Sequence, residues 1–233
     1  METDEPLISV IIPVFNEELT IGNVVERVKT VLQKIGFKYE TIVVDDFSTD
    51  RSLELSNRQG VKVYSLKKHM GKGYALRAGF AKAKGGIITT IDSDGSHRPE
   101  ELPLLLNPIL QDKADLIIGS RYLSQKPVAA KKLNAIGVRL FNLLIEVFTR
   151  VQVSDSQSGY RVMKSEVLRN MSLKSGGYEI ESEMLVKTAR QGFRVREVPI
   201  SFEQRTYGTS RLDPMVDGSK ILLSIVSAYM RGG

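Results

Sequence analysis

Short apolar runs alternate with longer amphipathic segments along the first half of this chain, and this alternation restricts the fold more than any other feature. Runs of about five apolar residues have the length of buried strands, and the spacing of Val24, Val28 and Val31 is helical. The pattern predicts an α/β fold with a mostly parallel, doubly wound sheet and helices on both faces. The expected strands are 7–14, 39–44, 61–66, 87–91 and 115–119, and the expected helices are 18–33, 52–58, 72–84 and 99–111.

The second half of the chain has a different pattern. No flexible linker precedes it, so we interpret residues 1–233 as one domain with an amphipathic helical extension at its C-terminal end. The expected elements are a long apolar helix at 133–150, a small strand-and-turn region around 159–161, a helix at 181–190, a strand at 195–202 and an apolar helix at 215–230.

Composition narrows the possible partners. The net charge of +6 favours anionic ones, although no face of aromatic and basic residues indicates nucleic acid. The absence of cysteine excludes disulfides and thiolate metal sites, and two histidines make a multi-histidine zinc site a poor fit. The acidic N-terminus does not resemble a signal peptide, and no apolar run reaches the roughly 20 residues of a membrane span.

Two carboxylates, Asp92 and Asp94, directly follow the apolar run 87–91. A turn is the plain interpretation, since Asp and Gly95 are common turn residues. The alternative is a divalent cation site, because hard cations such as Mg²⁺ prefer oxygen ligands and complete their shell with water and phosphates. Ligands of doubly wound sheets bind outside the carboxyl ends of strands, which is where this pair is expected.

Polar residues also follow three other expected strands, at 13–17, 45–50 and 119–122. A helix cap or turn explains any one of them. Together they place several carboxylates on one rim of the sheet, where they repel each other unless a cation or a basic ligand compensates. The glycine-containing loop 69–73 precedes an expected helix and suits either phosphate binding or a simple helix entry.

In combination these motifs resemble glycosyltransferase family 2, the inverting nucleotide-sugar enzymes with the GT-A fold, and within it the dolichyl-phosphate (polyprenyl-phosphate) mannose synthases. The resemblance covers nearly the whole chain. The motifs that carry it are Pro13-Val14-Phe15-Asn16-Glu17, Val44-Asp45-Asp46-x-Ser48-x-Asp50, Gly71-Lys72-Gly73, Asp92-x-Asp94-Gly95-Ser96-His97, Gly119-Ser120-Arg121-Tyr122, Asp155-x-x-Ser158-Gly159-Tyr160-Arg161, Glu197-Val198-Pro199 and Arg205-Thr206-Tyr207-Gly208-Thr209-Ser210-Arg211.

The resemblance implies a role for each matched residue. Residues 1–122 would bind the nucleotide sugar, and residues 123–233 would face the acceptor and the membrane. The implied donor-site residues are Pro13, Phe15, Glu17, Val44, Asp46, Lys72, Asp92, Ser93, Asp94, Arg121, Arg205 and Arg211, of which Asp94, Arg121 and Arg205 would be catalytic. The implied ligands of Mg²⁺ or Mn²⁺ are Asp92, Asp94 and Ser96, and the implied contacts of the acceptor phosphate are Arg121, Lys131, Lys132 and Ser210.

The implied reaction moves a hexose, mannose from GDP-mannose or glucose from UDP-glucose, onto dolichyl or polyprenyl phosphate. A metal and arginines would neutralise the departing diphosphate. The acceptor phosphate is already ionised, so a general base such as Asp94 is an alternative and no requirement. Two other functions stay open: a family 2 transferase that acts on a saccharide or protein, and a non-catalytic nucleotide-sugar-binding or scaffold protein.

The long apolar helix at 133–150 follows two lysines and suits an interfacial position on anionic lipid. We therefore expect a peripheral protein on the cytoplasmic face of a membrane, with Leu140 and Phe148 among the lipid-facing residues. A core helix or a homodimer face is the alternative for this helix and for the last one. Asp155 and Arg161 suit either an internal ion pair or substrate contact.

Overall fold

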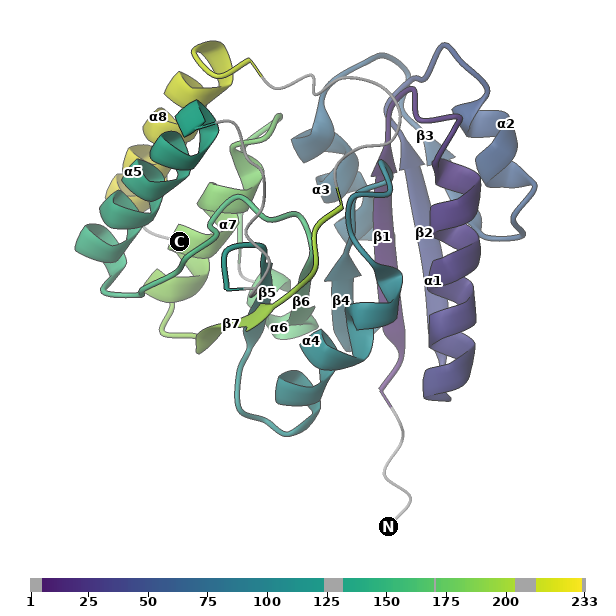
Figure 1. The fold of residues 1–233 in the computed structure, drawn as a ribbon, viewed down its shortest axis with the longest axis horizontal. Helices are drawn as coiled ribbons and strands as arrows, with labels where there is room; N and C mark the ends of the chain where they lie inside the picture. The colour runs from purple at the N-terminus through teal and green to yellow at the C-terminus, as the bar shows by residue number, and fades with distance from the viewer. Residues whose placement is uncertain (1–5, 124–131, 170, 204–212, 232–233) are drawn as a thin grey trace.

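The computed structural model of the protein describes residues 6–123, 132–169, 171–203 and 213–231. In this part of the chain a seven-stranded sheet runs through the molecule in the order β3-β2-β1-β4-β6-β5-β7 (Figure 1). The predicted α/β class is confirmed. The strands are β1 (Ile8–Val14), β2 (Tyr39–Asp45), β3 (Lys62–Ser65), β4 (Ile87–Thr90), β5 (Leu116–Ser120), β6 (Arg161–Lys164) and β7 (Val195–Pro199).

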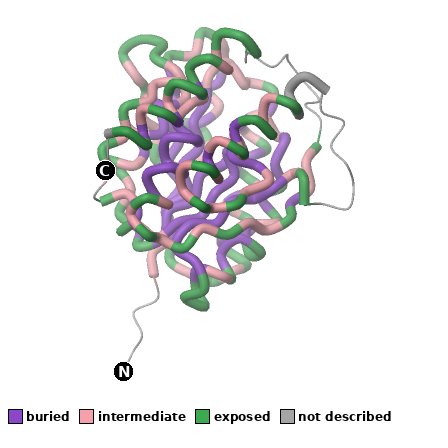
Figure 2. The backbone as a smooth tube through the Cα atoms, turned by 90° about the vertical axis from the view of Figure 1, so that its left-hand side faces the viewer, coloured by how far each residue is buried: buried purple, intermediate pink, exposed green. Residues whose placement is uncertain are grey.

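Helices cover both faces of the sheet, as the apolar pattern of the strands requires. Val10 and Ile12 of β1 pack in one core with α1 and α4, whereas Ile11 points to the opposite face and packs in a second core. The buried strands form the interior in Figure 2, and the helices keep exposed outer faces. The helices are α1 (Ile21–Ile35), α2 (Ser52–Asn57), α3 (Lys72–Lys82), α4 (Leu102–Leu110) after the 3-10 turn η1 (Pro99–Glu101), α5 (Lys132–Thr149), α6 (Ser165–Arg169), α7 (Ile180–Arg190) and α8 (Val216–Arg231).

One strand departs from the predicted order. β6 lies between β4 and β5 and is antiparallel to both. β4 and β5 are consecutive in the predicted series of strands, but they are not neighbours in the sheet. The sequence indicates only a small strand-and-turn region here, because the strand has four residues and its two ends are the charged residues Arg161 and Lys164. The short helix α6 that follows is not predicted either. The predicted helix at 99–111 divides into η1 and α4, with Pro103 in the first turn of α4.

The order of the strands reverses at β1, which pairs with β2 on one side and with β4 on the other. Such a switch point leaves a crevice outside the carboxyl ends of the strands. The residues that directly follow these three strands are Phe15, Asp46 and Ile91-Asp92. The fold therefore brings the polar strand ends of the sequence to one rim, as predicted.

The C-terminal extension is built from α5 and α8, which pack on each other beside α7 (Figure 1). Ile145 and Ile225 are buried between these helices, and the Phe148 and Tyr229 rings stack with centroids 4.6 Å apart. Phe148 is thus partly buried against its own protein, whereas Leu140 is 50% exposed, and the expected lipid face of α5 stays a prediction. Among the described residues, no helix has the length and apolarity to cross a membrane.

Candidate active site

The loops after β1 and β2 hold each other in place through their polar side chains. The Asn16 N–H donates to Ser48 Oγ at 2.9 Å, and the Thr49 N–H donates to Asn16 Oδ1 at 2.7 Å. Asn16 and Phe47 adopt the left-handed backbone conformation, with φ of 53° and 65°. A bulky residue such as Phe47 rarely adopts it, so the surrounding hydrogen bonds determine this turn. Much of the polar sequence after these strands therefore shapes the rim of the crevice.

Asp46, after β2, is nearly buried and holds the loop that precedes α3. Its carboxylate accepts the N–H groups of Met70 and Gly71, both at 2.7 Å, and lies 2.8 Å from His69 Nδ1. The His69 ring stacks on Phe15, with centroids 3.9 Å apart and planes 15° apart. Phe15 and Asp46 thus lie side by side at this rim, as their implied shared role requires. Pro13 and Val44 are paired across the two strands and lie buried beneath them.

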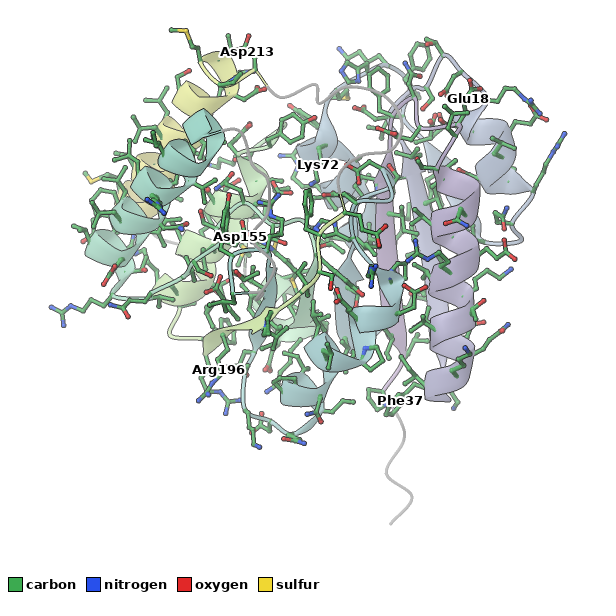
Figure 3. The ribbon with its side chains drawn as sticks, viewed as in Figure 1. Glu18, Phe37, Lys72, Asp155, Arg196 and Asp213 are labelled. Atoms are coloured by element: carbon green, nitrogen blue, oxygen red, sulfur yellow. The ribbon has the colours of Figure 1, made fainter. Side chains whose placement is uncertain are left out.

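Lys72 and two carboxylates form the charged centre of the crevice. Lys72 Nζ lies 2.6 Å from Asp92 Oδ1 and 2.7 Å from Glu181 Oε1. Burial alone would lower the pKa of Lys72, but the two carboxylates outweigh it and raise that pKa above its ordinary value. Burial would raise the pKa of Asp92, but Lys72 and then His97 lower it to about 2. Lys72 and Asp92 are therefore both charged at neutral pH. Lys72 lies at the start of α3, toward the upper end of the sheet in Figure 3, whereas Phe37 lies at the lower end.

Gly159 allows this centre to form. A Cβ atom at this position would lie 2.6 Å from Asp92 Oδ2 and 2.8 Å from Lys72 Nζ. Any side chain would therefore displace the ion pair. His97 lies on the other side of Asp92, with Nδ1 3.8 Å from Asp92 Oδ2. Neither ring nitrogen of His97 has a hydrogen-bond partner among the described residues, and burial lowers the pKa of His97.

Asp94 lies two residues beyond Asp92 in the same turn. Its Oδ1 accepts the N–H of Ser96 at 3.0 Å and the Ser96 hydroxyl at 2.6 Å, and Ser93 is buried. Within the described residues, no three His, Asp or Glu side chains gather in a way that holds a metal ion. The chain supplies two carboxylates and a hydroxyl group. This all-oxygen set fits Mg²⁺ or Mn²⁺ when phosphate oxygens or water complete the shell.

Arg121, after β5, is fixed by a buried carboxylate from the loop before β6. Its Nε and Nη2 each lie 2.7 Å from Asp155, a bidentate ion pair that raises the pKa of Arg121 despite its burial. The backbone N–H of Asp155 in turn donates to Glu197 at 2.9 Å. Arg161 is not the partner of Asp155. It is fully buried and donates to the carbonyl groups of residues 156, 158 and 181. Asp155 and Arg161 are therefore structural supports of the crevice.

The chain returns to the crevice after β7. His97 pairs with Phe202 in an isolated β-bridge, and the N–H of Glu203 donates to the Ser96 carbonyl at 2.9 Å. Glu203 is the last described residue before residues 204–212. Several implied site residues lie outside the described residues: Lys131, Arg205, Ser210 and Arg211, together with the side chain of Lys132.

The sequence analysis assigns no role to Glu181 or Gly159, although both lie at the charged centre of the site. Glu181 is on α7, 89 positions after Asp92, where the sequence indicates an ordinary amphipathic helix. Its nearly complete burial is visible only in the structure. Gly159 belongs to a motif of the resemblance, but nothing in the sequence shows that its missing side chain makes room for Asp92 and Lys72.

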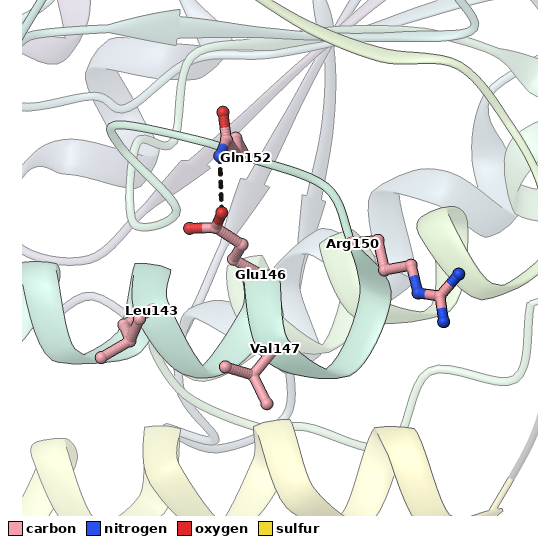
Figure 4. A pocket seen from close by; sticks show the side chains of 5 residues that line it. All are labelled: Leu143, Glu146, Val147, Arg150 and Gln152. Carbon is pink, nitrogen blue, oxygen red and sulfur yellow. Dashed lines mark hydrogen bonds between the residues drawn. The ribbon is translucent and has the colours of Figure 1, made fainter.

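One hollow on the described surface lies away from this crevice. It has a volume of about 670 Å³ and is lined by Leu143, Glu146, Val147, Arg150 and Gln152 at the end of α5 (Figure 4). Glu146 and Gln152 hydrogen-bond across it at 2.6 Å. None of these residues is among the predicted site residues.

The strand order and the switch-point crevice define a GT-A-type α/β fold, and solved structures share it. Glucosyl-3-phosphoglycerate synthase from Mycobacterium tuberculosis, solved with Mn²⁺, UDP and phosphoglyceric acid, superposes with a TM-score of 0.77. The two proteins are 23% identical, and the match covers 96% of this chain and 78% of the other. At this identity the likeness shows the fold alone.

Sequence comparisons identify the family. Residues 9–172 match the family described as Glycosyl transferase family 2. An uncharacterized protein, MJ1222, from Methanocaldococcus jannaschii is 32% identical over 97% of this chain and 93% of its own length. A dolichol-phosphate mannosyltransferase from Pyrococcus furiosus is 34% identical over 88% of this chain, which spans only 59% of that relative. The chain belongs to glycosyltransferase family 2, and the protein is a glycosyltransferase.

Proposed function

We propose that the enzyme transfers a hexose from a nucleotide diphosphate sugar to dolichyl or polyprenyl phosphate, with inversion, with a divalent cation and at a membrane surface. The observation that carries this proposal is the pair Asp92 and Asp94 at the end of β4, in the crevice at the switch point of the sheet. The name of the Pyrococcus furiosus relative supports the lipid phosphate acceptor and mannose as the sugar. GDP-mannose is therefore the first donor to test.

In this proposal the donor lies across the carboxyl ends of β1, β2 and β4. Its nucleoside contacts Phe15 and Asp46, and its diphosphate faces Asp92 and Asp94. Asp92, Asp94 and the Ser96 hydroxyl would hold Mg²⁺ or Mn²⁺, which neutralises the charge that develops on the leaving diphosphate. Residues 1–122 form this donor half, and residues 123–233 form the acceptor half.

Lys72 acts as a fixed positive charge in this proposal. Its raised pKa keeps it protonated at neutral pH, so it is unsuited to remove a proton. Its ion pairs with Asp92 and Glu181 hold the Asp92 carboxylate at the rim. Preorganised charges of this kind lower the barrier because they need no rearrangement as charge develops in the transition state.

Arg121 is the proposed phosphate contact among the described residues. Two of its nitrogens bind Asp155, which orients the guanidinium group, while Nη1 makes no hydrogen bond within the described part of the chain. A phosphate monoester has a second pKa near 6, so the acceptor is mostly a dianion at neutral pH and is itself the nucleophile. We propose that catalysis consists of positioning and electrostatic stabilisation, without a general base.

The exposed faces of α5 and α8 support a membrane surface as the place of reaction. Ile136, Leu143 and Val147 of α5 are 55–66% exposed, and Leu223 and Met230 of α8 are 68% and 74% exposed. Amphipathic helices with such faces lie in the interface between lipid headgroups and acyl chains. A polyprenyl acceptor would then reach the crevice from the side of α5.

The experiment that tests this function uses two donors and one lipid. The protein is incubated with polyprenyl phosphate, Mn²⁺ and radiolabelled GDP-mannose or UDP-glucose, and the lipid is extracted. We expect label in the lipid fraction with one donor. Label that enters only added saccharide would favour a saccharide acceptor, and no transfer with either donor would refute the proposal.

A further inference from the structure

One loop engages both groups that the proposed function assigns to the donor nucleoside. The His69 imidazole lies flat on the Phe15 ring, with centroids 3.9 Å apart and planes 15° apart. Its Nδ1 lies 2.8 Å from Asp46 Oδ2. A planar ring stacked on an aromatic side chain, with a nitrogen at hydrogen-bond distance from a polar group, is also how proteins hold a nucleobase. His69 therefore reproduces with its own side chain the contacts of a bound base.

No base fits between these two rings. At 3.9 Å the rings are in van der Waals contact, and an inserted ring would need about twice that separation. Asp46 is also occupied, since it accepts the N–H groups of Met70 and Gly71 as well as facing His69, and it is only 2% exposed. A nucleoside reaches this face of Phe15 and the carboxylate of Asp46 only after the loop has moved.

The loop has the features of a segment that moves between fixed ends. Residues 67–70 are exposed and lie outside helices and strands, and the His69 side chain is 54% exposed. Both ends are held: the Leu66 N–H donates to the Asp45 carbonyl at 2.8 Å, and Gly71 packs so closely on the Gly176 carbonyl that a Cβ atom would lie 2.6 Å from it. The middle of the loop already faces solvent, so opening it mainly loses the contacts of His69 and Met70 with Phe15 and Asp46.

We propose that His69 is an internal substitute for the donor base, and that residues 67–70 form a latch that closes the donor site until a nucleotide displaces it. The inference rests on the proposed function of the crevice as a nucleotide-sugar site. The apparent Kd is the intrinsic Kd divided by the open fraction. A latch that is closed in about nine of ten molecules raises the Kd about tenfold.

The test measures binding of UDP and GDP, each with Mn²⁺, by titration calorimetry. His69→Ala removes both the ring and the nitrogen, whereas His69→Phe keeps a ring that can stack on Phe15 without facing Asp46. Met70→Ala is the matched control, because it shortens a neighbouring side chain and keeps the backbone N–H on Asp46. We expect His69→Ala to bind the preferred nucleotide about tenfold more tightly than the wild type. His69→Phe should fall between them, and Met70→Ala should match the wild type.

Association kinetics provide a second readout. With a latch, the observed rate of nucleotide binding to the wild type levels off at high nucleotide concentration, because opening limits it, and His69→Ala removes this plateau. Equal binding by His69→Ala would mean that the ring does not affect nucleotide affinity, and weaker binding would mean that the ring contacts the nucleotide. Either result overturns the latch and leaves the proposed function intact. Absence of nucleotide binding by the wild type and all variants refutes the proposed function and the latch with it.

Discussion

The crevice at the strand ends and the helix pair α5–α8 use their residues in opposite ways. In the crevice, Glu181 is almost fully buried and forms an ion pair with the largely buried Lys72, an arrangement that proteins tolerate only when the charges compensate each other. In the helix pair, large apolar side chains such as Val147 and Leu223 are exposed. Buried charge suits chemistry on an anionic ligand, and exposed apolar side chains on paired helices suit a partner surface. The two regions therefore match the two partners of the proposed function, a nucleotide-sugar donor in the crevice and a lipid surface on the helix pair.

The helices α1 and α5 have similar apolar periodicity but differ in the residues that they expose. Both helices bury one apolar face against the sheet or its neighbours. The exposed positions of α1 are polar, as at Glu26 and Thr30, whereas α5 exposes Ile136 and Leu140. α5 therefore carries more apolar residues than its core contacts use, and this excess is the basis for proposing it as a membrane-facing helix.

The largest expected effect is loss of transfer in Asp94→Ala. The substitution removes one of the two proposed metal carboxylates, and we expect activity to fall by about 10³-fold or more. The wild-type circular dichroism spectrum should be retained, since Asp94 is only partly buried at the end of a strand. Activity of Asp94→Ala within about threefold of the wild type would contradict the proposed role of Asp94 as a metal ligand.

A pair of glycine substitutions compares the two regions directly. In Gly159→Ala the added Cβ atom would meet Asp92 and Lys72, so we expect lower stability, by about 1–3 kcal/mol, and at least tenfold lower activity. In Gly137→Ala on α5 the nearest atom is Phe141 Cε2 at 4.0 Å, so helix propensity should dominate and stability should rise by about 0.5–1 kcal/mol. Denaturant unfolding measures the stability of the two variants, and transfer assays measure their activity. Equal changes in Gly159→Ala and Gly137→Ala would contradict the close packing of Gly159 against Asp92 and Lys72.

The residues at the rim of the site could be predicted from the sequence, whereas those in its interior, such as Glu181, could not. The polar sequences after the apolar strands predict that Phe15, Asp46 and Asp92 lie on one rim, because parallel strands share one carboxyl edge. The contribution of Glu181 depends on how α7 packs across the molecule, which local periodicity does not encode. Likewise, β6 is inserted between β4 and β5 by long-range pairing of a strand with only four residues.

Vesicle binding tests whether the exposed apolar side chains of α5 and α8 contact lipid. We expect Val147→Ser combined with Leu223→Ser to weaken binding to anionic vesicles about tenfold, because both side chains are more than 60% exposed on the proposed lipid face. Nucleotide affinity should not change. Leu19→Ser is the matched control, since this leucine is 65% exposed on the donor half. Equal loss in the control, or no loss in the double variant, would remove α5 and α8 as the membrane face.

The smallest expected effect comes from Asp115, before β5 and away from both regions. Its carboxylate accepts from Arg194 Nε at 2.9 Å, and this hydrogen bond holds the pKa of Asp115 well below its ordinary value of 3.8. A lowered pKa in the folded state contributes stability above pH 3.8, which is lost as the pH falls below it. Asp115→Asn should therefore cost about 1 kcal/mol at pH 7 and less at pH 3, with transfer activity unchanged.

Glu166→Gln is the control for this prediction, because Glu166 is exposed and 3.8 Å from Lys164 in the same charged cluster. Its unfolding free energy should match the wild type at both pH values. A penalty for Asp115→Asn that grows as the pH falls would contradict the assigned direction of the pKa shift.

The cation dependence of sugar transfer to a lipid phosphate shows whether the reaction needs a metal ion held by Asp92 and Asp94. Wild-type protein, polyprenyl phosphate in vesicles and the labelled donor are combined with Mn²⁺, with excess chelator, or with chelator followed by more Mn²⁺. We predict labelled lipid with Mn²⁺, none with chelator, and full recovery when Mn²⁺ is restored. Labelled lipid formed equally well in the presence of chelator would contradict the proposed role of Asp92 and Asp94.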